Sequence, residues 1–285
     1  MKRICIFIDG ENMKFSLKKL YEPEEGVNSV ERQFPAHKAH WQQWFDALCT
    51  DAAEGSHSVR VRTYWYHIDG VQYYPPTKLL KKDSGSIRRW VEFNKHDLSS
   101  TDRQTAEEWM EQWNETNKSD EEIKNYAKEK LAELNAQRQW FDNIHTGIRY
   151  RQQQIAAHNR AVQFCRSGEI RYNLITKKLG EEKTVDVNMA VDMVAKADNF
   201  DTAIVISGDQ DCVPAVVHLK DCGKEVINVS FEKNGKLLPG GAKLLNETTD
   251  WTISVSAHDL DKVLKLKKAS KEEEEKRPVK KTKTL

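Results

Sequence analysis

The chain of 285 residues is predicted to form an α/β fold with a doubly wound, mostly parallel sheet. Two short apolar runs, residues 4–8 and 203–206, have the composition of strands that are buried on both faces. Each run is followed by a segment with helical character, and such alternation is typical of parallel sheets. Acidic residues follow both runs directly, and ligands of these sheets bind beyond the carboxyl ends of the strands.

The first 70 residues predict two strands and two helices. Glu11 opens the first helix, and residues 37–53 show helical periodicity with their aromatic residues on one face. Residues 58–68 alternate and are rich in β-branched and aromatic side chains, which predicts a second strand. We interpret this segment as a core strand rather than a base-stacking surface, with Tyr66 and His67 near its carboxyl end.

Residues 79–166 differ in composition from the sequence on either side. Strand signals disappear and Glu, Lys, Gln, Asn and Trp dominate, which predicts an insertion of two or three helices. Ser119 followed by Glu122 resembles a capping box, and Gly168 is expected to end the last helix. Three tryptophans at helical spacing predict the core of a helical subdomain or an oligomer contact: Trp109, Trp113 and Trp140.

The rest of the chain predicts a return to strand and helix alternation. The expected elements are a strand over 169–175, a loop over 177–183, a helix over 185–198, a strand over 202–207, a helix over 213–222, a strand over 225–231, and a short helix and strand over 244–255. Blocks of like charge from about residue 268 predict a disordered tail. The predicted organisation is a core of residues 1–78 and 167–257, a helical insertion of 79–166, and a helix end and tail of 258–285.

Composition excludes several classes of protein. With a net charge of +1, the protein has no overall electrostatic field that would attract nucleic acid or a membrane. Any affinity for nucleic acid must therefore come from local patches of positive charge. The five cysteines form no CxxC pair, which indicates reduced thiols in a cytoplasmic protein without disulfides or a zinc site. No apolar stretch is long enough to span a bilayer. The phosphate-binding patterns G-x-x-x-x-G-K-[ST] and G-x-G-x-x-G are absent, which argues against nucleotide hydrolysis and a dinucleotide cofactor.

Four aspartates stand where the carboxyl ends of parallel strands meet: Asp9, Asp186, Asp209 and Asp211. Carboxylates gathered at one edge repel one another unless a cation or a shared proton neutralises them. A divalent ion held by oxygen ligands, Mg²⁺ or Mn²⁺, fits such a cluster. Each aspartate also has a structural alternative, because each lies where it can cap a helix or complement its dipole.

Asp192 lies six residues after Asp186 on the same predicted helix. Six residues correspond to about 600° of rotation, so the two side chains point roughly 120° apart. Asp192 is therefore expected to support the metal ligands from behind, or to pair with Lys196 one turn further on.

Three motifs resemble the signatures of NYN domains, and more narrowly those of the LabA-like branch of the PIN-like nuclease superfamily. They are FIDGEN at 7–12, KTVDVNMAVD at 183–192 and SGDQD at 207–211. The similarity covers roughly residues 1–70 and 165–256. Two departures are Cys212, where the family usually has an aromatic residue, and the long segment 79–166, which is not part of the common core.

The resemblance implies a metal-dependent endoribonuclease that hydrolyses RNA phosphodiester bonds. It implies that Asp9, Asp186, Asp209 and Asp211 hold one or two Mg²⁺ or Mn²⁺ ions. Asn12 would orient the first acid or a water molecule. Lys183 and Ser207 would bind the substrate.

Two other functions fit the same residues. One is a non-catalytic RNA-binding or regulatory module that keeps the acids for structure or weak metal binding. The other is a phosphatase or DNA flap nuclease with a similar acidic cluster. In each case the helical insertion is expected to select the substrate, or to mediate contact with a second copy or a protein partner.

Overall fold

The computed structural model describes residues 1–21, 34–74, 120–174, 177–238 and 243–266. The chain forms two compact units. One comprises Met1–His67, Ile148–Ser167 and Thr184–Leu285, and the other comprises Ile68–Gly147 and Gly168–Lys183. Three elements run from one unit into the other: β2 (Ser58–Tyr74), α6 (Asp120–His158) and β3 (Val162–Asn173).

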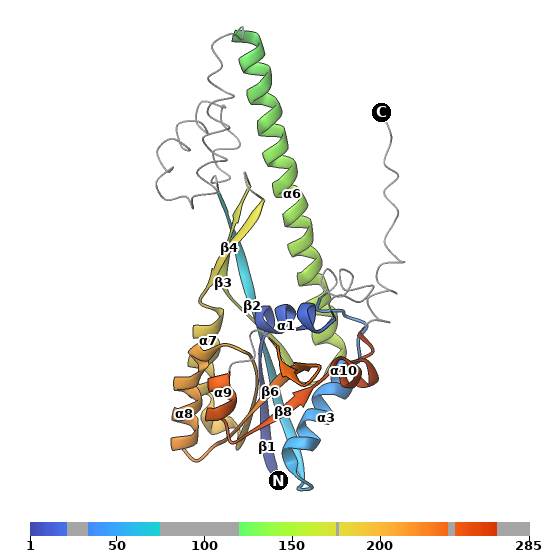
Figure 1. The fold of residues 1–285 in the computed structure, drawn as a ribbon, viewed down its shortest axis with the longest axis vertical. Helices are drawn as coiled ribbons and strands as arrows, with labels where there is room; N and C mark the ends of the chain where they lie inside the picture. The colour runs from blue at the N-terminus through green and yellow to red at the C-terminus, as the bar shows by residue number, and fades with distance from the viewer. Residues whose placement is uncertain (22–33, 75–119, 175–176, 239–242, 267–285) are drawn as a thin grey trace. The chain divides into compact units, whose positions relative to one another are not determined.

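The first unit is built on a sheet with parallel central strands in the order β2-β1-β5-β6-β8 (Figure 1). Its strands besides β2 are β1 (Lys2–Asp9), β5 (Thr202–Ile206), β6 (Glu225–Lys233) and β8 (Trp251–Val255). Two strands pair antiparallel at the margins, β7 (Lys236–Leu237) with β6 and β4 (Lys178–Lys183) with β3. The predicted mostly parallel α/β fold is confirmed.

Helices cover both faces of this sheet. Alternate side chains of β1 point to opposite faces, as the pleat of a strand requires. Ile4, Ile6 and Ile8 share a core with α1 (Gly10–Tyr21), α3 (Trp41–Ala53) and α10 (Ala257–Val263). Phe7 packs against Tyr64 and Phe200 instead. The remaining helices are α7 (Val185–Ala195), α8 (Val213–Asp221) and α9 (Lys243–Thr248), and α7 and α8 lie across the sheet from α3 (Figure 1).

The pairing of β1 with its two neighbours sets the position of the acidic motifs. Ile8 lies opposite Ile206 of β5, and Asp9 lies opposite Tyr66 of β2. Strands β1 and β5 therefore end at the same level of the sheet. The chain leaves β1 toward β2 and leaves β5 toward β6, in opposite directions. The ends of β1 and β5 therefore form the topological switch point at which open α/β sheets bind ligands.

The predicted helical segment 79–166 differs from the structure in its C-terminal part. Residues 75–119, with the capping box and two of the tryptophans, lie outside the described residues. From residue 120 the chain forms a single helix of 39 residues, α6, whose Trp140 is 54% exposed. The expectation that Gly168 ends the last helix is wrong, because α6 ends at His158 and Gly168 lies inside β3. The backbone of Ala161 has a φ of 56°, which a continuing helix does not allow.

The predicted loop over 177–183 is also wrong, since most of it forms β4. Its charged composition suggested a solvated loop, but charged side chains are equally typical of a strand at the edge of a sheet. Gly180 lets the two strands approach, because a Cβ there would lie 3.3 Å from the Cβ of Arg171 on β3. In the same unit, Phe141 of α6 stacks on Tyr172 of β3 with ring centroids 4.2 Å apart.

One hairpin was missing from the sequence prediction, which ended the strand at residue 231. Strand β6 continues to Lys233 and turns back as β7. The two turn residues, Asn234 and Gly235, have φ values of 54° and 72°, as a type I′ turn requires. No helix in the described residues combines the length and apolarity needed to cross a membrane.

Candidate functional site

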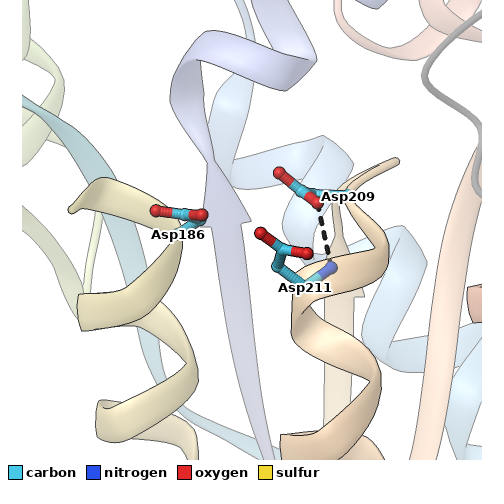
Figure 2. Close-up of side chains that lie close together, drawn as sticks. All are labelled: Asp186, Asp209 and Asp211. Atoms are coloured by element: carbon cyan, nitrogen blue, oxygen red, sulfur yellow. Dashed lines mark hydrogen bonds between the residues drawn. The ribbon is translucent and has the colours of Figure 1, made fainter. Parts of the chain in front are cut away.

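Three of the predicted acids meet at the carboxyl edge of the sheet (Figure 2). One carboxylate oxygen from each of Asp186, Asp209 and Asp211 lies within 4.8 Å of the other two. Asp186 comes from α7, whereas the other two come from the segment between β5 and α8. Asp186 and Asp209 are partly buried, and Asp211 is exposed.

The turn after β5 fixes Asp209 through its own backbone. Asp209 caps the short 3-10 helix Gln210–Cys212, and its Oδ1 accepts a hydrogen bond of 2.9 Å from the amide of Asp211. The buried hydroxyl of Ser207 accepts a bond of 3.0 Å from the amide of Asp209. Both acids therefore project from a turn that is hydrogen-bonded within itself. Pro214 then opens α8, where a missing N–H costs nothing.

Asp186 stands in the first turn of α7, where unpaired backbone N–H groups favour a negative charge. The preceding residue, Thr184, has a φ of 86° and makes no capping hydrogen bond through its side chain. Asp186 thus provides the negative charge at this helix end. Helix α7 packs against the 3-10 helix that carries Asp211, so the two acidic motifs meet although 25 residues separate them, from 186 to 211.

Asp9 lies beside this group and not in it. Its side chain is only 5% exposed, and its two oxygens accept hydrogen bonds from the Asn12 amide at 2.9 Å and the Ser207 hydroxyl at 3.2 Å. Burial raises the pKa of Asp9 to about 6, and the negative charges of Glu11 and Asp209 add to this shift. Ser207 is the bridge between the two acidic sets, since it donates to Asp9 and accepts from the amide of Asp209.

Two residues predicted to act on substrate have structural partners. The side-chain oxygen of Asn12 accepts a hydrogen bond of 2.8 Å from the amide of Gly208. This bond ties the start of α1 to the turn that carries Asp209. Ser207 is buried and hydrogen-bonded as described above. Lys183 lies at the end of β4, and its side chain is outside the described part of the chain.

Asp192 forms the ion pair with Lys196 that its spacing predicts. It also accepts a hydrogen bond of 2.8 Å from the hydroxyl of Tyr66, which is a contact that the sequence did not predict. Tyr66 is 1% exposed and lies next to Asp9 in the sheet. This bond joins α7, about one and two-thirds turns after Asp186, to the middle of β2. The sequence predicted a core strand over residues 58–68 with Tyr66 near its carboxyl end, but nothing in it identified the partner of this hydroxyl.

Gly10 is required by the close approach of β2. A Cβ at this position would lie 2.4 Å from the carbonyl oxygen of Tyr66 and 2.5 Å from Cε1 of His67. His67 is 3% exposed and packs parallel to Trp65, with its Nδ1 3.5 Å from Glu11.

Cys212 is fully buried, and burial raises the pKa of its thiol to about 12, with Asp9 and Asp209 adding to the shift.

The donor set fits a hard divalent cation. All three groups are carboxylates, and oxygen ligands around one Mg²⁺ lie about 3–4 Å apart, given bonds of about 2.1 Å. Small rotations of the three side chains would bring oxygen atoms that now lie within 4.8 Å of one another to that spacing. Without a cation, three carboxylates this close repel one another, and no Lys or Arg is paired with any of them among the described residues.

The model of the NYN domain family matches residues 98–239. This match supports assignment of the chain to the NYN family. NYN domains are generally nucleases of the PIN-like superfamily, and the matched span contains Asp186, Asp209 and Asp211. It starts within the segment 79–166 and does not reach Asp9, so the match does not extend to the first predicted motif.

One solved structure aligns with this chain over most of its length. It is the crystal structure of a protein of unknown function from Vibrio parahaemolyticus, and the alignment covers 90% of this chain and 94% of the other at 13% identity. The TM-score is 0.39, which is too low to establish a shared fold. No curated protein matches the chain.

The raised pKa of Asp9 predicts how stability depends on pH. Because its folded pKa of about 6 lies above the ordinary 3.8, ionisation costs the folded state free energy, and this cost appears as pH rises through that window. Asp9→Asn keeps the acceptor for Asn12 but carries no charge. We expect the variant to gain stability relative to the wild type by up to about 3 kcal/mol between pH 4 and 7. Urea unfolding in the presence of a chelator measures this, and a difference in stability that stays constant with pH contradicts it.

Gly10→Ala tests the contact between α1 and β2. Its Cβ would clash with a backbone carbonyl that cannot rotate away, so we expect a loss of about 1–3 kcal/mol in the free energy of unfolding. Gly55→Ala is the matched control, because its Cβ meets no atom within 4 Å and only its φ of 83° opposes it. A loss in Gly10→Ala of less than about 1 kcal/mol, measured by chemical denaturation, would show that the contact is not tight.

Proposed function

We propose that this NYN protein is a metal-dependent endoribonuclease of the LabA-like branch. The observation that supports the proposal is the meeting of Asp186, Asp209 and Asp211 at the switch point of a sheet, in a chain that the NYN family model matches. All five cysteines are free, which agrees with a reducing compartment such as the cytoplasm.

In this proposal the three carboxylates hold Mg²⁺ or Mn²⁺, and Asp9 is the fourth acid. Asp209 uses Oδ1 for the Asp211 amide, which leaves its second oxygen for the ion. Asp9 sets the edge of the site through Ser207, and each of its oxygens accepts one hydrogen bond and keeps a second lone pair that could bind the ion. Asp192 supports Asp186 by holding α7 to Tyr66. Lys183 is the proposed contact to a substrate phosphate.

Phosphodiester hydrolysis needs a nucleophilic water, neutralised phosphate oxygens and a stabilised leaving oxygen. A bound divalent ion lowers the pKa of water and neutralises phosphate charge. The protein must then accept one proton from the attacking water. Asp211 is the exposed member of the cluster, so its free oxygen is best placed to do this. No histidine serves this role within the motifs, and His67 is buried beside Glu11.

Metal binding gives the first test. We expect wild-type protein to bind Mn²⁺, and Asp209→Asn to weaken binding at least about tenfold, because a neutral amide replaces a charged ligand. Asp221→Asn is the matched control, since it removes one exposed carboxylate from α8 outside the cluster. Isothermal titration measures both affinities. Equal Mn²⁺ affinity in all three proteins would place the ion elsewhere.

Cleavage of RNA gives the second test. With Mn²⁺ or Mg²⁺ present, we expect the wild type to cleave a single-stranded RNA internally, and Asp186→Asn and Asp209→Asn to lose at least about 100-fold in rate. Asp221→Asn should cleave at the wild-type rate. Gel analysis of end-labelled RNA, with circular dichroism to verify folding, provides the measurement.

The same assay separates the remaining functions. Full cleavage by both ligand variants would reject the catalytic assignment and indicate a contaminating nuclease. Binding of RNA without cleavage, at any metal concentration, would instead indicate a non-catalytic module. Faster hydrolysis of DNA or of a small phosphate ester than of RNA would indicate a flap nuclease or a phosphatase.

A further inference from the structure

Helix α7 is apolar on both of its sides. Its inward side is formed by buried residues, Val185, Met189 and Met193. On the outward side, Val187, Val191 and Val194 are 57%, 60% and 36% exposed. The outward face of a surface helix is normally polar, and a helix that is apolar all round is normally covered all round. The outward side of α7 therefore indicates a contact with another molecule.

The three exposed valines form one continuous stripe. They follow one another at intervals of four and three residues, which places neighbouring Cβ atoms about 5–6 Å apart on the helix surface. Single exposed apolar side chains are normal on a protein surface, but contiguous ones mark a site of interaction. Val217 on α8 and Leu244 on α9 are exposed as well. Because α8 packs against α7 and α9 packs against α8, exposed apolar surface is concentrated on these neighbouring helices.

The face of α7 that carries the stripe is uncharged. Its other exposed residues are Asn188 and Ala195. The acids of the helix have partners elsewhere, since Asp186 belongs to the acidic cluster and Asp192 is paired with Lys196. A nucleic acid or a charged protein would require charges of the opposite sign on this face. Two copies of one uncharged face, in contrast, meet without repulsion between like charges.

The stripe is also complementary to itself. A dimer with two-fold symmetry joins the same patch of both copies, so the patch must fit its own copy. A spacing of four and three residues is that of the seam along which helices pair. In an antiparallel pair with the two-fold axis near Val191, Val187 of one copy packs on Val194 of the other. Both are valines, and the adjacent Ala190 and Ala195 are small enough to let the two helices approach closely.

We propose that the outward face of α7, residues 187–195, pairs with the same face of a second copy of this chain, with the two helices antiparallel. The helix has 11 residues and is therefore about 16 Å long. Its face alone is smaller than the roughly 800 Å² per partner that stable interfaces bury. The dimer is therefore reversible, with a dissociation constant on the order of 10–100 µM.

The oligomeric state of the full chain tests the pairing. Sedimentation velocity over about 5–500 µM protein should show the wild type changing from monomer to dimer. Val191→Asp should remain monomeric, because two carboxylates would meet at the two-fold axis. Val191→Ala should weaken the dimer at least about fivefold, since both copies lose the central apolar contact. Val59→Ala is the matched control and should dimerise like the wild type, because Val59 is 38% exposed on β2, outside the stripe.

A wild type that is monomeric over the whole range overturns the proposal, and so does a dimer that Val191→Asp leaves intact. Circular dichroism verifies that the variants are folded, as expected for changes at an exposed position. The pairing does not depend on the nuclease function. Asp209→Asn should therefore dimerise like the wild type even though it loses metal binding, because Asp209 lies outside the stripe.

Disulfide cross-linking tests the antiparallel register. The experiment uses a Cys222→Ser background, because Cys222 is the exposed native thiol. Val187→Cys mixed with Val194→Cys should form a cross-linked dimer under mild oxidation. Val187→Cys alone should not, since its two copies would lie about 10 Å apart along the helix axes, and a disulfide needs Cα atoms within about 7 Å. Efficient cross-linking of Val187→Cys with itself, or an equal yield from Val59→Cys mixed with Val194→Cys, overturns the antiparallel pairing.

Discussion

The parallel pairing of β1 with β5 is the constraint on which the site depends. It ends both strands at one level, so the Asp9 carboxylate reaches the hydroxyl of Ser207 and the Asn12 amide oxygen reaches the backbone of Gly208. A shift of one residue would turn every side chain of β1 to the other face and bury charge against the helices. The same pairing that builds the core therefore positions both the acidic turn and the start of α1.

Electrostatic repulsion among the carboxylates opposes this arrangement, and a different local interaction offsets it at each aspartate. Asp9 is buried with two donors, and its pKa still rises to about 6, so the hydrogen bonds offset only part of the desolvation. Asp186 gains from the N-terminus of α7, and Asp209 from the amide of Asp211. None of these dipoles carries a full positive charge. A divalent cation would offset the repulsion among Asp186, Asp209 and Asp211 at once, so this donor set fits a metal ion.

The sequence predicted the elements whose signals are local and missed those that depend on neighbours. The apolar runs of β1 and β5 and the acids after them identified the edge of the sheet, because strands buried on both faces have few alternatives. The end of α6 and strand β4 were missed, since highly charged segments look the same in a solvated helix, an edge strand or a loop. The turn at Asn234 and Gly235 did carry a signal, as an Asn-Gly pair is the strongest short-range sign of a hairpin. The bonds of Asn12 to Gly208 and of Tyr66 to Asp192 join residues far apart in the chain, and no pattern in one sequence reveals such partners.

The acidic cluster alone would not distinguish one nucleic acid from another. A phosphate diester would look the same to three carboxylates and an ion whether it lay in RNA or DNA, in a single strand or a duplex. Selection therefore requires a group that contacts a base or a sugar, and such a group must be held at a fixed distance from the cluster. The start of helix α1 is held in this way, because the helix follows Asp9 directly and Asn12 accepts a hydrogen bond from the amide of Gly208 in the acidic turn.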